Sequence, residues 1–271
     1  MAQDRVPLYP ADAVPFAKQG ADLPSITIYQ PKHPQPGGKA VIVCSGGAYI
    51  GRANDVEGIP ACKKLSTSGI TAILLDYRVP RADMMESKEW VPFTDAQRAI
   101  QFVREHAAKY KLNKHQVGIM GFSAGGHLVA TVGTRSDTTQ LRNPLHTSLR
   151  PDFMILVYPV ISFADSLTHW ESRNRLIGPD ISPENIAYYS NELHVTKNTP
   201  PAFITHGLDD EAVKSINSLY FAAALQQHHV PVKLFLYTHG AHGYGIYNKG
   251  AMVQWIDDCI DWINQNRWKL R

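Results

Sequence analysis

A glycine–serine turn at residues 121–125 is the feature of this sequence with the clearest chemical potential. It reads G-x-S-x-G, follows an apolar run at 116–121 and precedes an apolar stretch at 126–132. A serine between a strand and a helix in this way is typical of a nucleophile elbow, whose flanking glycines avoid collisions with neighbouring backbone. The N-terminus of the following helix favours developing negative charge. The pattern therefore predicts that Ser123 is a catalytic nucleophile.

An acidic pair follows further along the chain, as a catalytic serine requires. A serine hydroxyl is activated by a base, and an acid orients that base. Asp209 and Asp210 follow an apolar run at 202–206 after two intervening residues, past the end of an expected strand where parallel sheets place their sites. We expect Asp210 to be the acid, because it stands three residues before Val213 and should face the next loop. Asp209 is the alternative, and it could instead cap the turn.

Two histidines lie in that next loop, after the apolar run 232–237. The order serine, acid, histidine is the order in which one large class of serine hydrolases arranges its catalytic residues. We expect His242 to be the base, because its small neighbours in Gly-Ala-His-Gly allow the ring to approach Ser123. His239 sits nearer the end of the strand, where a structural role is the simpler interpretation.

A second glycine-rich turn, Ser-Gly-Gly-Ala-Tyr at 45–49, follows the apolar run 40–44. Backbone N–H groups in such a turn can stabilise the negative oxygen that forms when a nucleophile attacks a carbonyl. We expect Gly47 and Ala48 to supply such donors, and the N–H of Ala124, just after the nucleophile, to supply another. The sequence thus predicts an oxyanion hole to accompany the other catalytic groups.

The scaffold for these residues is predicted by an alternation of two periods. Short β-branched or aliphatic runs, several of them apolar on both faces, alternate with stretches at helical spacing. Runs of this kind belong inside a sheet that helices cover on both sides. We therefore predict an α/β fold with a mostly parallel central sheet. The expected strands are 26–29, 40–44, 71–76, 116–121, 153–158, 202–206 and 232–237.

Three amphipathic helices are expected from apolar residues at helical spacing. Near 95–107 the buried face should hold Ala96, Ala99, Ile100, Val103 and Ala107, with a capping box from Thr94 to Gln97 preceded by Pro92. The inward face of the second should hold Ile216, Leu219, Tyr220 and Ala223. The inward residues of the third should be Met252, Ile256, Cys259, Ile260 and Ile263.

The segment at about 162–200 is too long for an ordinary connection and contains only short helical patches such as 183–189. We expect a small insertion over one edge of the sheet, within a single domain that covers residues 1–271. Trp170 and Tyr188 in this insertion, together with Tyr49, are candidates for contact with a substrate. The alternative for these aromatic side chains is packing within the protein.

Composition excludes several classes of protein. The chain has 271 residues, 27 Lys and Arg against 24 Asp and Glu, and a net charge of +3, with no basic run of the kind that binds nucleic acid. No apolar run is long enough for a membrane helix. Cys44, Cys62 and Cys259 are expected to be buried free thiols. No cofactor or metal site is expected, because the adjacent His228 and His229 have no carboxylates at ligand spacing.

Taken together, these segments resemble the α/β-hydrolase esterases grouped with bacterial acetyl xylan esterases and the BD-FAE-like carboxylesterases. The resemblance implies an α/β-hydrolase fold, Ser123 as nucleophile, Asp210 as acid and His242 as base. The chain departs from the family pattern at Ala48, where glycine is usual, and after Val213, where Pro and Glu are usual. The segments that carry the resemblance include CSGGAY (44–49), VEGIPA (56–61), GIMGFSAGGHLVA (118–130), PPAFITHGLDDEAV (200–213) and GAHGYG (240–245).

The expected function is a serine ester hydrolase, and the resemblance implies carbohydrate-linked acetyl esters as its substrates. The reaction would remove acetyl groups from xylan or xylo-oligosaccharides through an acyl-enzyme. The alternatives are a general short-chain carboxylesterase, a feruloyl-type esterase and an inactive carbohydrate-binding homologue. No nucleic-acid or membrane partner is expected.

Met1-Ala2-Gln3-Asp4 resembles a start residue placed before a processed end. We therefore expect a periplasmic or secreted protein, with a cytoplasmic one as the alternative.

Overall fold

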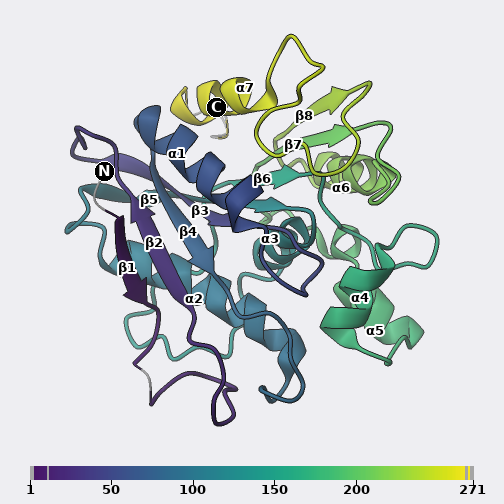
Figure 1. Ribbon diagram of the computed structural model, residues 1–271, viewed down its shortest axis with the longest axis horizontal. Helices are drawn as coiled ribbons and strands as arrows, with labels where there is room; N and C mark the ends of the chain where they lie inside the picture. Colours follow the sequence, from purple (N-terminus) through teal and green to yellow (C-terminus); the bar gives the residue numbers. More distant parts are fainter. Residues whose placement is uncertain (1–2, 11, 266–267, 269–271) are drawn as a thin grey trace.

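An eight-stranded sheet runs through the whole molecule, and the computed structural model describes residues 3–10, 12–265 and 268 (Figure 1). The strand order is β1-β2-β4-β3-β5-β6-β7-β8, parallel from β4 to β8 and antiparallel where β1 and β2 form one edge. This confirms the predicted mostly parallel α/β architecture. The strands are β1 (Gln3–Pro7), β2 (Ser25–Tyr29), β3 (Gly38–Cys44), β4 (Thr71–Asp76), β5 (Leu112–Phe122), β6 (Met154–Val157), β7 (Ala202–Gly207) and β8 (Val232–Tyr237).

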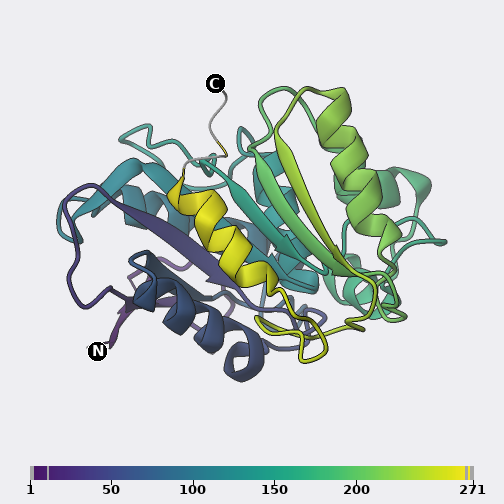
Figure 2. The same ribbon diagram turned by 90° about the horizontal axis from the view of Figure 1, so that it is seen from above.

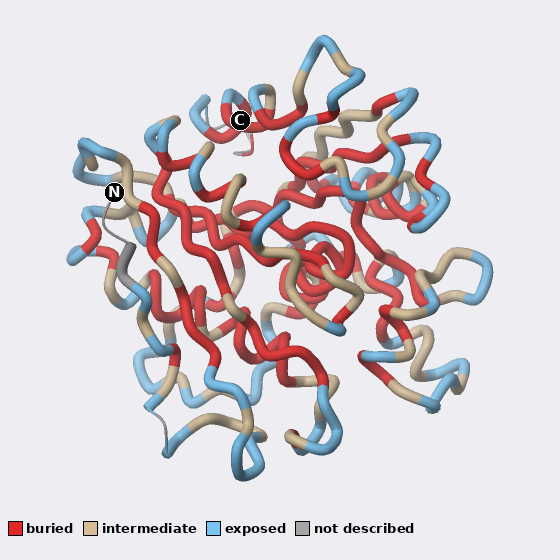
Figure 3. Tube along the Cα trace, in the orientation of Figure 1, coloured by how far each residue is buried: buried red, intermediate tan, exposed pale blue. Residues whose placement is uncertain are grey.

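Helices cover both faces of this sheet (Figures 1 and 2). On one face lie α1 (Ile59–Thr67) and α7 (Trp255–Asn264), and on the other lie α2 (Val91–Glu105), α3 (Ala124–Thr134) and α6 (Ile216–Gln227). Successive side chains of a strand point to opposite faces, so the central strands feed two apolar cores. Figure 3 shows these strands and α3 buried along most of their length. Cys44, Cys62 and Cys259 are buried free thiols, as predicted.

The three predicted helices exist, but several details of their sequence-based description are wrong. Helix α2 begins at Val91, so Thr94 lies inside it, and its hydroxyl donates to the carbonyl of Trp90 at 2.8 Å instead of forming a capping box. Pro92 occupies the first turn, where its missing N–H costs nothing. Met252 lies outside α7 and is fully exposed.

The predicted inward face of α6 is also wrong. Tyr220 is half exposed and Ala223 is exposed, whereas Asn217 and Phe221 are buried. The reason is polar: the Asn217 side-chain oxygen accepts hydrogen bonds from the backbone N–H groups of Ile161 and Ser162, both at 3.0 Å. Because the Asn217 amide must be buried to accept from these two backbone donors, the helix turns inward a different face from the one that apolar spacing indicates.

The insertion forms two short helices, α4 (Trp170–Ile177) and α5 (Pro183–Tyr189), beside α3 and α6 (Figure 1). The predicted patch at 183–189 is therefore helical, whereas α4 and the edge strand β1 were not predicted.

Of the N-terminal residues read as a processed end, Met1 and Ala2 lie outside the described residues, and Gln3 and Asp4 belong to β1. In the described part of the chain, none of the helices combines the length and apolar character needed to cross a membrane.

Candidate active site

Ser123 occupies the sharp turn between β5 and α3, with φ 50° and ψ −118°. A non-glycine residue rarely adopts such a positive φ, so the surrounding turn must impose it. A side chain at Gly121 would come within 2.1 Å of the Gly125 carbonyl oxygen, and one at Gly125 within 2.3 Å of the Cys44 carbonyl oxygen. The two glycines are therefore required for the reason that the sequence pattern predicted.

The structure brings together the three side chains that the sequence selected. His242 Nε2 lies 3.0 Å from Ser123 Oγ, and His242 Nδ1 lies 2.7 Å from Asp210 Oδ2. Asp210 is buried, whereas the His242 side chain is 25% exposed. With Nδ1–H donating a hydrogen bond to Asp210, Nε2 carries a lone pair directed at the serine hydroxyl. This arrangement can transfer a proton from Ser123 to His242.

The Asp210 carboxylate is held by more than His242. Its Oδ1 accepts the backbone N–H groups of Ala212 and Val213 at 3.0 and 2.8 Å, and its Oδ2 also lies 3.2 Å from His206 Nε2. Burial by itself raises the pKa of Asp210, but the hydrogen bonds from His206, His242 and Val213 outweigh it and hold the pKa below its usual range. Asp210 is therefore ionised at neutral pH.

The alternatives for acid and base lie elsewhere in the same loops. Asp209 Oδ1 accepts hydrogen bonds from the backbone N–H groups of Gly240 and Ala241, both at 2.8 Å. These bonds stabilise the loop that carries His242. The His239 side chain is 86% exposed, and its Nδ1 lies 3.6 Å from Asp209. Neither residue is hydrogen-bonded to Ser123 or His242 in the described structure.

The glycine-rich turn after β3 adopts an unusual backbone, with φ 122° at Gly47 and φ 52° at Ala48. A side chain at Gly47 would lie 2.6 Å from the Gly51 carbonyl oxygen, which explains the glycine. Ala48 accepts a left-handed conformation that glycine would adopt without strain. Among the described residues, no acceptor takes the backbone N–H of Gly47, Ala48 or Ala124, so these three predicted donors are free to bind a ligand.

Sequence reasoning missed Glu57, which connects the glycine-rich turn to the histidine. Its Oε2 accepts the Gly46 N–H at 2.6 Å, and its Oε1 accepts the Tyr158 hydroxyl at 2.9 Å. The Tyr158 oxygen in turn accepts the Gly245 N–H at 3.1 Å, and its ring packs edge-on against His242, with centroids 4.8 Å apart. Burial raises the pKa of Glu57, while the Gly46 and Tyr158 hydrogen bonds oppose the rise. The available signal was an acidic residue inside the apolar segment VEGIPA.

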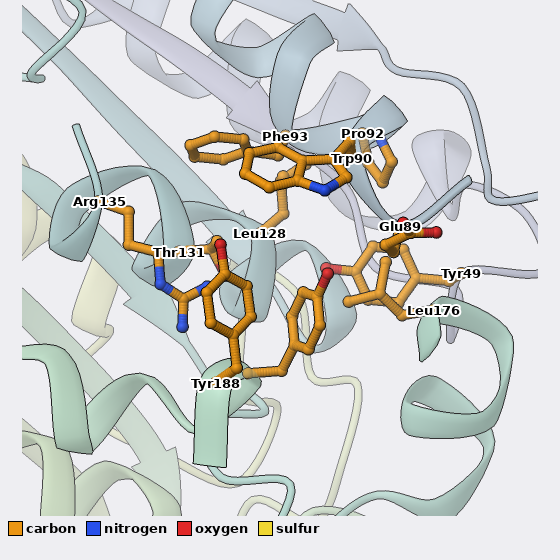
Figure 4. Close-up of a pocket in the computed structure, with 11 residues that line it drawn as sticks. Tyr49, Glu89, Trp90, Pro92, Phe93, Leu128, Thr131, Arg135, Leu176 and Tyr188 are labelled. Atoms are coloured by element: carbon orange, nitrogen blue, oxygen red, sulfur yellow. The ribbon is translucent and has the colours of Figure 1, made fainter. Parts of the chain in front are cut away.

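The three aromatic candidates for substrate contact have different environments. Tyr49 is 1% exposed, and its hydroxyl bonds to His127 Nδ1 at 3.0 Å, so this candidate for substrate contact instead packs within the protein, as the alternative had it. Tyr188 is 37% exposed, but the Arg135 guanidinium lies over its ring at 4.1 Å (Figure 4). Trp170 is 62% exposed at the start of α4. Of the three, Trp170 offers the most open ring.

A metal site is not evident in the described part of the chain, where no cluster of three or more His, Cys, Asp or Glu side chains could hold an ion. His228 and His229 lie exposed just after α6.

Most of the chain is similar to known proteins. The model of the BD-FAE family matches residues 26–225. An acetylxylan esterase of Xylanibacter ruminicola is 34% identical over 229 residues, which are 83% of this chain and 44% of that protein. An endo-1,4-β-xylanase B of Butyrivibrio fibrisolvens is 33% identical over 217 residues, which are 79% of this chain and 34% of that protein. This chain thus spans less than half the length of these two relatives.

Solved structures show a similar fold over nearly the entire chain. The acetyl ester-xyloside bifunctional hydrolase of Caldicellulosiruptor lactoaceticus superimposes with a TM-score of 0.87 and 34% identity, covering 98% of this chain and 97% of that one. A thermophilic esterase of Thermogutta terrifontis, with propionate bound, gives a TM-score of 0.78 at 22% identity, covering 99% of this chain and 96% of that one. Because the Thermogutta esterase is only 22% identical, its similarity supports the fold alone.

Proposed function

The chain belongs to the BD-FAE family of α/β-hydrolase fold proteins, and from that membership and the geometry above we propose that it is a serine esterase that removes acetyl groups from xylan or xylo-oligosaccharides. One observation carries the catalytic part: the continuous hydrogen-bonded series from Ser123 through His242 to the buried Asp210. The likeness to an acetylxylan esterase and to an acetyl ester-xyloside hydrolase supports the substrate class.

The first half of the proposed reaction transfers the acetyl group to the protein. His242 Nε2 takes the Ser123 proton as Oγ forms a bond to the ester carbonyl carbon. The carbonyl oxygen becomes negative and is stabilised by the N–H groups of Gly47, Ala48 and Ala124. The carbon–oxygen bond to the sugar then breaks, and the Nε2 proton passes to the departing sugar oxygen, which leaves as a hydroxyl group. Asp210 holds the tautomer of His242 and stabilises its cation.

The second half repeats these steps with water as the nucleophile. His242 removes a proton from water, whose oxygen bonds to the acetyl carbonyl carbon while the same N–H groups stabilise the negative oxygen. The bond from the acetyl carbon to Ser123 Oγ breaks, the proton returns to Ser123, and acetate leaves. The neutral substrate fits a chain whose net charge is only +3.

The test compares three ester classes with one enzyme preparation: an acetylated xylo-oligosaccharide, a small aryl acetate and a feruloyl ester. We expect the highest kcat/KM on the acetylated oligosaccharide, and no release above background from a Ser123→Ala variant. Preference for the feruloyl ester would replace the proposal with a feruloyl-type esterase, and activity on the aryl acetate alone would indicate a general short-chain esterase. Binding of the oligosaccharide without hydrolysis would indicate an inactive homologue.

A further inference from the structure

An open groove of about 510 Å³ lies between α4 and the glycine-rich turn that follows β3. Ile50, just after that turn, lines one side of the groove, and Asn174 and Arg175 of α4 line another. The segment 79–83 contributes to the lining as well. The volume lies within the range of roughly 300–1,000 Å³ that is usual for small-molecule sites. The groove is therefore large enough for a ligand of the size of a sugar ring.

The groove begins close to the predicted oxyanion hole. The Ile50 N–H donates to the Gly47 carbonyl at 2.8 Å, which closes a tight turn and places the two Cα atoms within about 7 Å of each other. Gly46 lies against the nucleophile, because a side chain there would come within 2.9 Å of the Ser123 Cβ atom. A substrate whose ester carbonyl lies at the N–H groups of Gly47 and Ala48 therefore has the groove within reach of its neighbouring groups.

The cations that line the groove already have partners. Arg81 pairs with Asp83 at 2.7 Å, and Arg175 pairs with Glu171 at 2.8 Å. The Lys88 ammonium donates to two carbonyl groups at the C-terminal end of α4, where the helix dipole is negative. An anionic ligand would have to compete with these partners, whereas the hydroxyl groups of a neutral ligand can bond to the same charged groups without displacing them. The electrostatics of the groove therefore favour a neutral, hydroxyl-rich ligand.

Three side chains beside these ion pairs are open to a ligand. The half-buried Asn174 amide lines the groove, and its side chain makes no hydrogen bond to another described residue. Ile50 is 55% exposed, although it is apolar. The exposed Trp170 ring stands one helical turn before Asn174, on the same side of α4. An amide can bond to sugar hydroxyls, and apolar side chains can cover the C–H face of a sugar ring.

We propose that this groove binds a xylose residue next to the one that carries the acetyl group, so that the enzyme prefers an oligosaccharide ester to a monosaccharide ester. The proposal rests on the proposed esterase function and adds a subsite to it. An acetyl group needs far less space than the groove provides, so the groove serves the sugar side of the ester. Asn174 bonds to hydroxyl groups of the bound residue, and Ile50 covers its apolar face.

The first test measures kcat/KM for the same acetyl ester on xylose and on xylotetraose, with a small aryl acetate as a measure of catalysis alone. Wild-type kcat/KM should be about tenfold higher on the xylotetraose ester, the effect of one or two additional hydrogen bonds. Asn174→Trp fills the groove and should abolish this preference. Its kcat/KM on the aryl acetate should stay within about twofold of wild type, which also shows that the variant is folded.

The matched control is Gln226→Trp, which places the same bulky ring at an exposed position of α6 that does not line the groove. This variant should keep the preference for xylotetraose. The subsite is overturned if the wild-type protein hydrolyses both sugar esters equally well, or if Asn174→Trp keeps the full preference. Either result would leave the proposed esterase function in place.

A binding measurement separates the subsite from the esterase function. Unacetylated xylotetraose is titrated calorimetrically into Ser123→Ala, with and without the Asn174→Trp change. We expect saturable binding that Asn174→Trp weakens by about tenfold. That result would support the groove even if the wild-type protein hydrolysed no acetylated oligosaccharide, an outcome that would refute the esterase proposal alone. Equal binding by the two proteins, or no binding by either, would overturn the groove as a sugar subsite.

Discussion

His206 Nε2 lies 3.2 Å from Asp210 Oδ2, the same oxygen atom that lies 2.7 Å from His242 Nδ1. His206 is completely buried, and its Nδ1 bonds to the Ser218 hydroxyl at 2.7 Å. One carboxylate oxygen therefore faces two imidazole rings, one internal and one next to the nucleophile. Asp210 thus contacts an imidazole ring on each side, and His206 Nε2 also lies 2.9 Å from the Val213 carbonyl oxygen, with which Asp210 shares it.

Asp210→Asn should reduce kcat by about 10⁴-fold, as the equivalent change does in other serine–histidine–aspartate enzymes. An amide nitrogen in place of Oδ2 would meet the N–H groups of His206 and His242, so His242 would be driven into the wrong tautomer. The measurement is kcat on an acetyl ester, with circular dichroism to show that the variant is folded. A folded variant that keeps more than about a tenth of wild-type kcat would contradict this role for Asp210.

Asp209→Asn is the matched control, since Asp209 is the neighbouring carboxylate in the same turn. Its Oδ1 fastens the histidine loop through Gly240 and Ala241, and an asparagine oxygen can accept the same two N–H groups. We expect kcat to fall by no more than about tenfold, the size of one weakened hydrogen bond. If Asp209→Asn costs more activity than Asp210→Asn, the assignment of the acid must be reversed.

Glu57→Gln should lower kcat by about 10²-fold with little change in KM. Only one oxygen of the amide can accept, so either the Gly46 N–H or the Tyr158 hydroxyl loses its partner. If the Gly46 N–H loses its acceptor, the turn that holds Gly47 and Ala48 is displaced. The fall in kcat should then approach that caused by losing one oxyanion-hole donor. KM should change little because Glu57 is buried behind the turn. Steady-state kinetics on an acetyl ester separates the two constants.

Tyr158→Phe is the comparison for that variant. It removes the hydroxyl that joins Glu57 to Gly245 but leaves the Gly46 hydrogen bond in place. The loss in kcat should therefore be smaller than in Glu57→Gln. Wild-type kcat in a correctly folded Glu57→Gln protein would show that Glu57 has no part in positioning the turn.

His127 should make the folded protein sensitive to mild acid. Burial lowers the pKa of His127 from 6.5 to about 3, against a smaller opposite effect of its hydrogen bond to the Tyr189 carbonyl. Between these two pH values the unfolded chain binds a proton that the folded protein does not, so the free energy of unfolding falls as the pH falls. The contribution of His127 to the loss between pH 7 and pH 5 should be about 2 kcal/mol. Urea unfolding at these pH values measures it.

His127→Gln should flatten this pH dependence by about the same amount, whatever its effect on stability at pH 7. His228→Gln, which changes an exposed histidine, should retain it. Asp210 does not interfere, because a carboxyl whose pKa is lowered loses its stabilising effect only below its ordinary value of about 4. An unchanged slope in His127→Gln would contradict the buried, neutral state of His127.

The sequence allowed the catalytic geometry to be predicted because each part has a local signal. The elbow around Ser123 depends on glycines that backbone sterics require, and the loops of Asp210 and His242 follow strands whose apolar runs are easily recognised. In a parallel sheet the carboxyl ends of such strands meet at one edge, so the chain order of the motifs was sufficient to bring them together.

What escaped prediction depends on contacts between distant segments. Glu57 meets Tyr158 across 101 residues, and Asn217 caps backbone groups of Ile161 and Ser162 more than 50 residues away. Tyr49 can be buried because its hydroxyl is hydrogen-bonded to His127 on α3. Local spacing carries no information about such partners, and a buried polar side chain resembles a surface one until its partner is known.

The most direct test of the central claim is to identify the residue that a serine-directed fluorophosphonate modifies in the wild-type protein. Peptide mass analysis should place a single adduct on Ser123, and an acetylated xylo-oligosaccharide should slow its formation. Ser123→Ala should remain unlabelled and should lose about 10⁶-fold in kcat on the same ester. Labelling at another serine, or ester hydrolysis by Ser123→Ala at more than a tenth of the wild-type rate, would contradict the account.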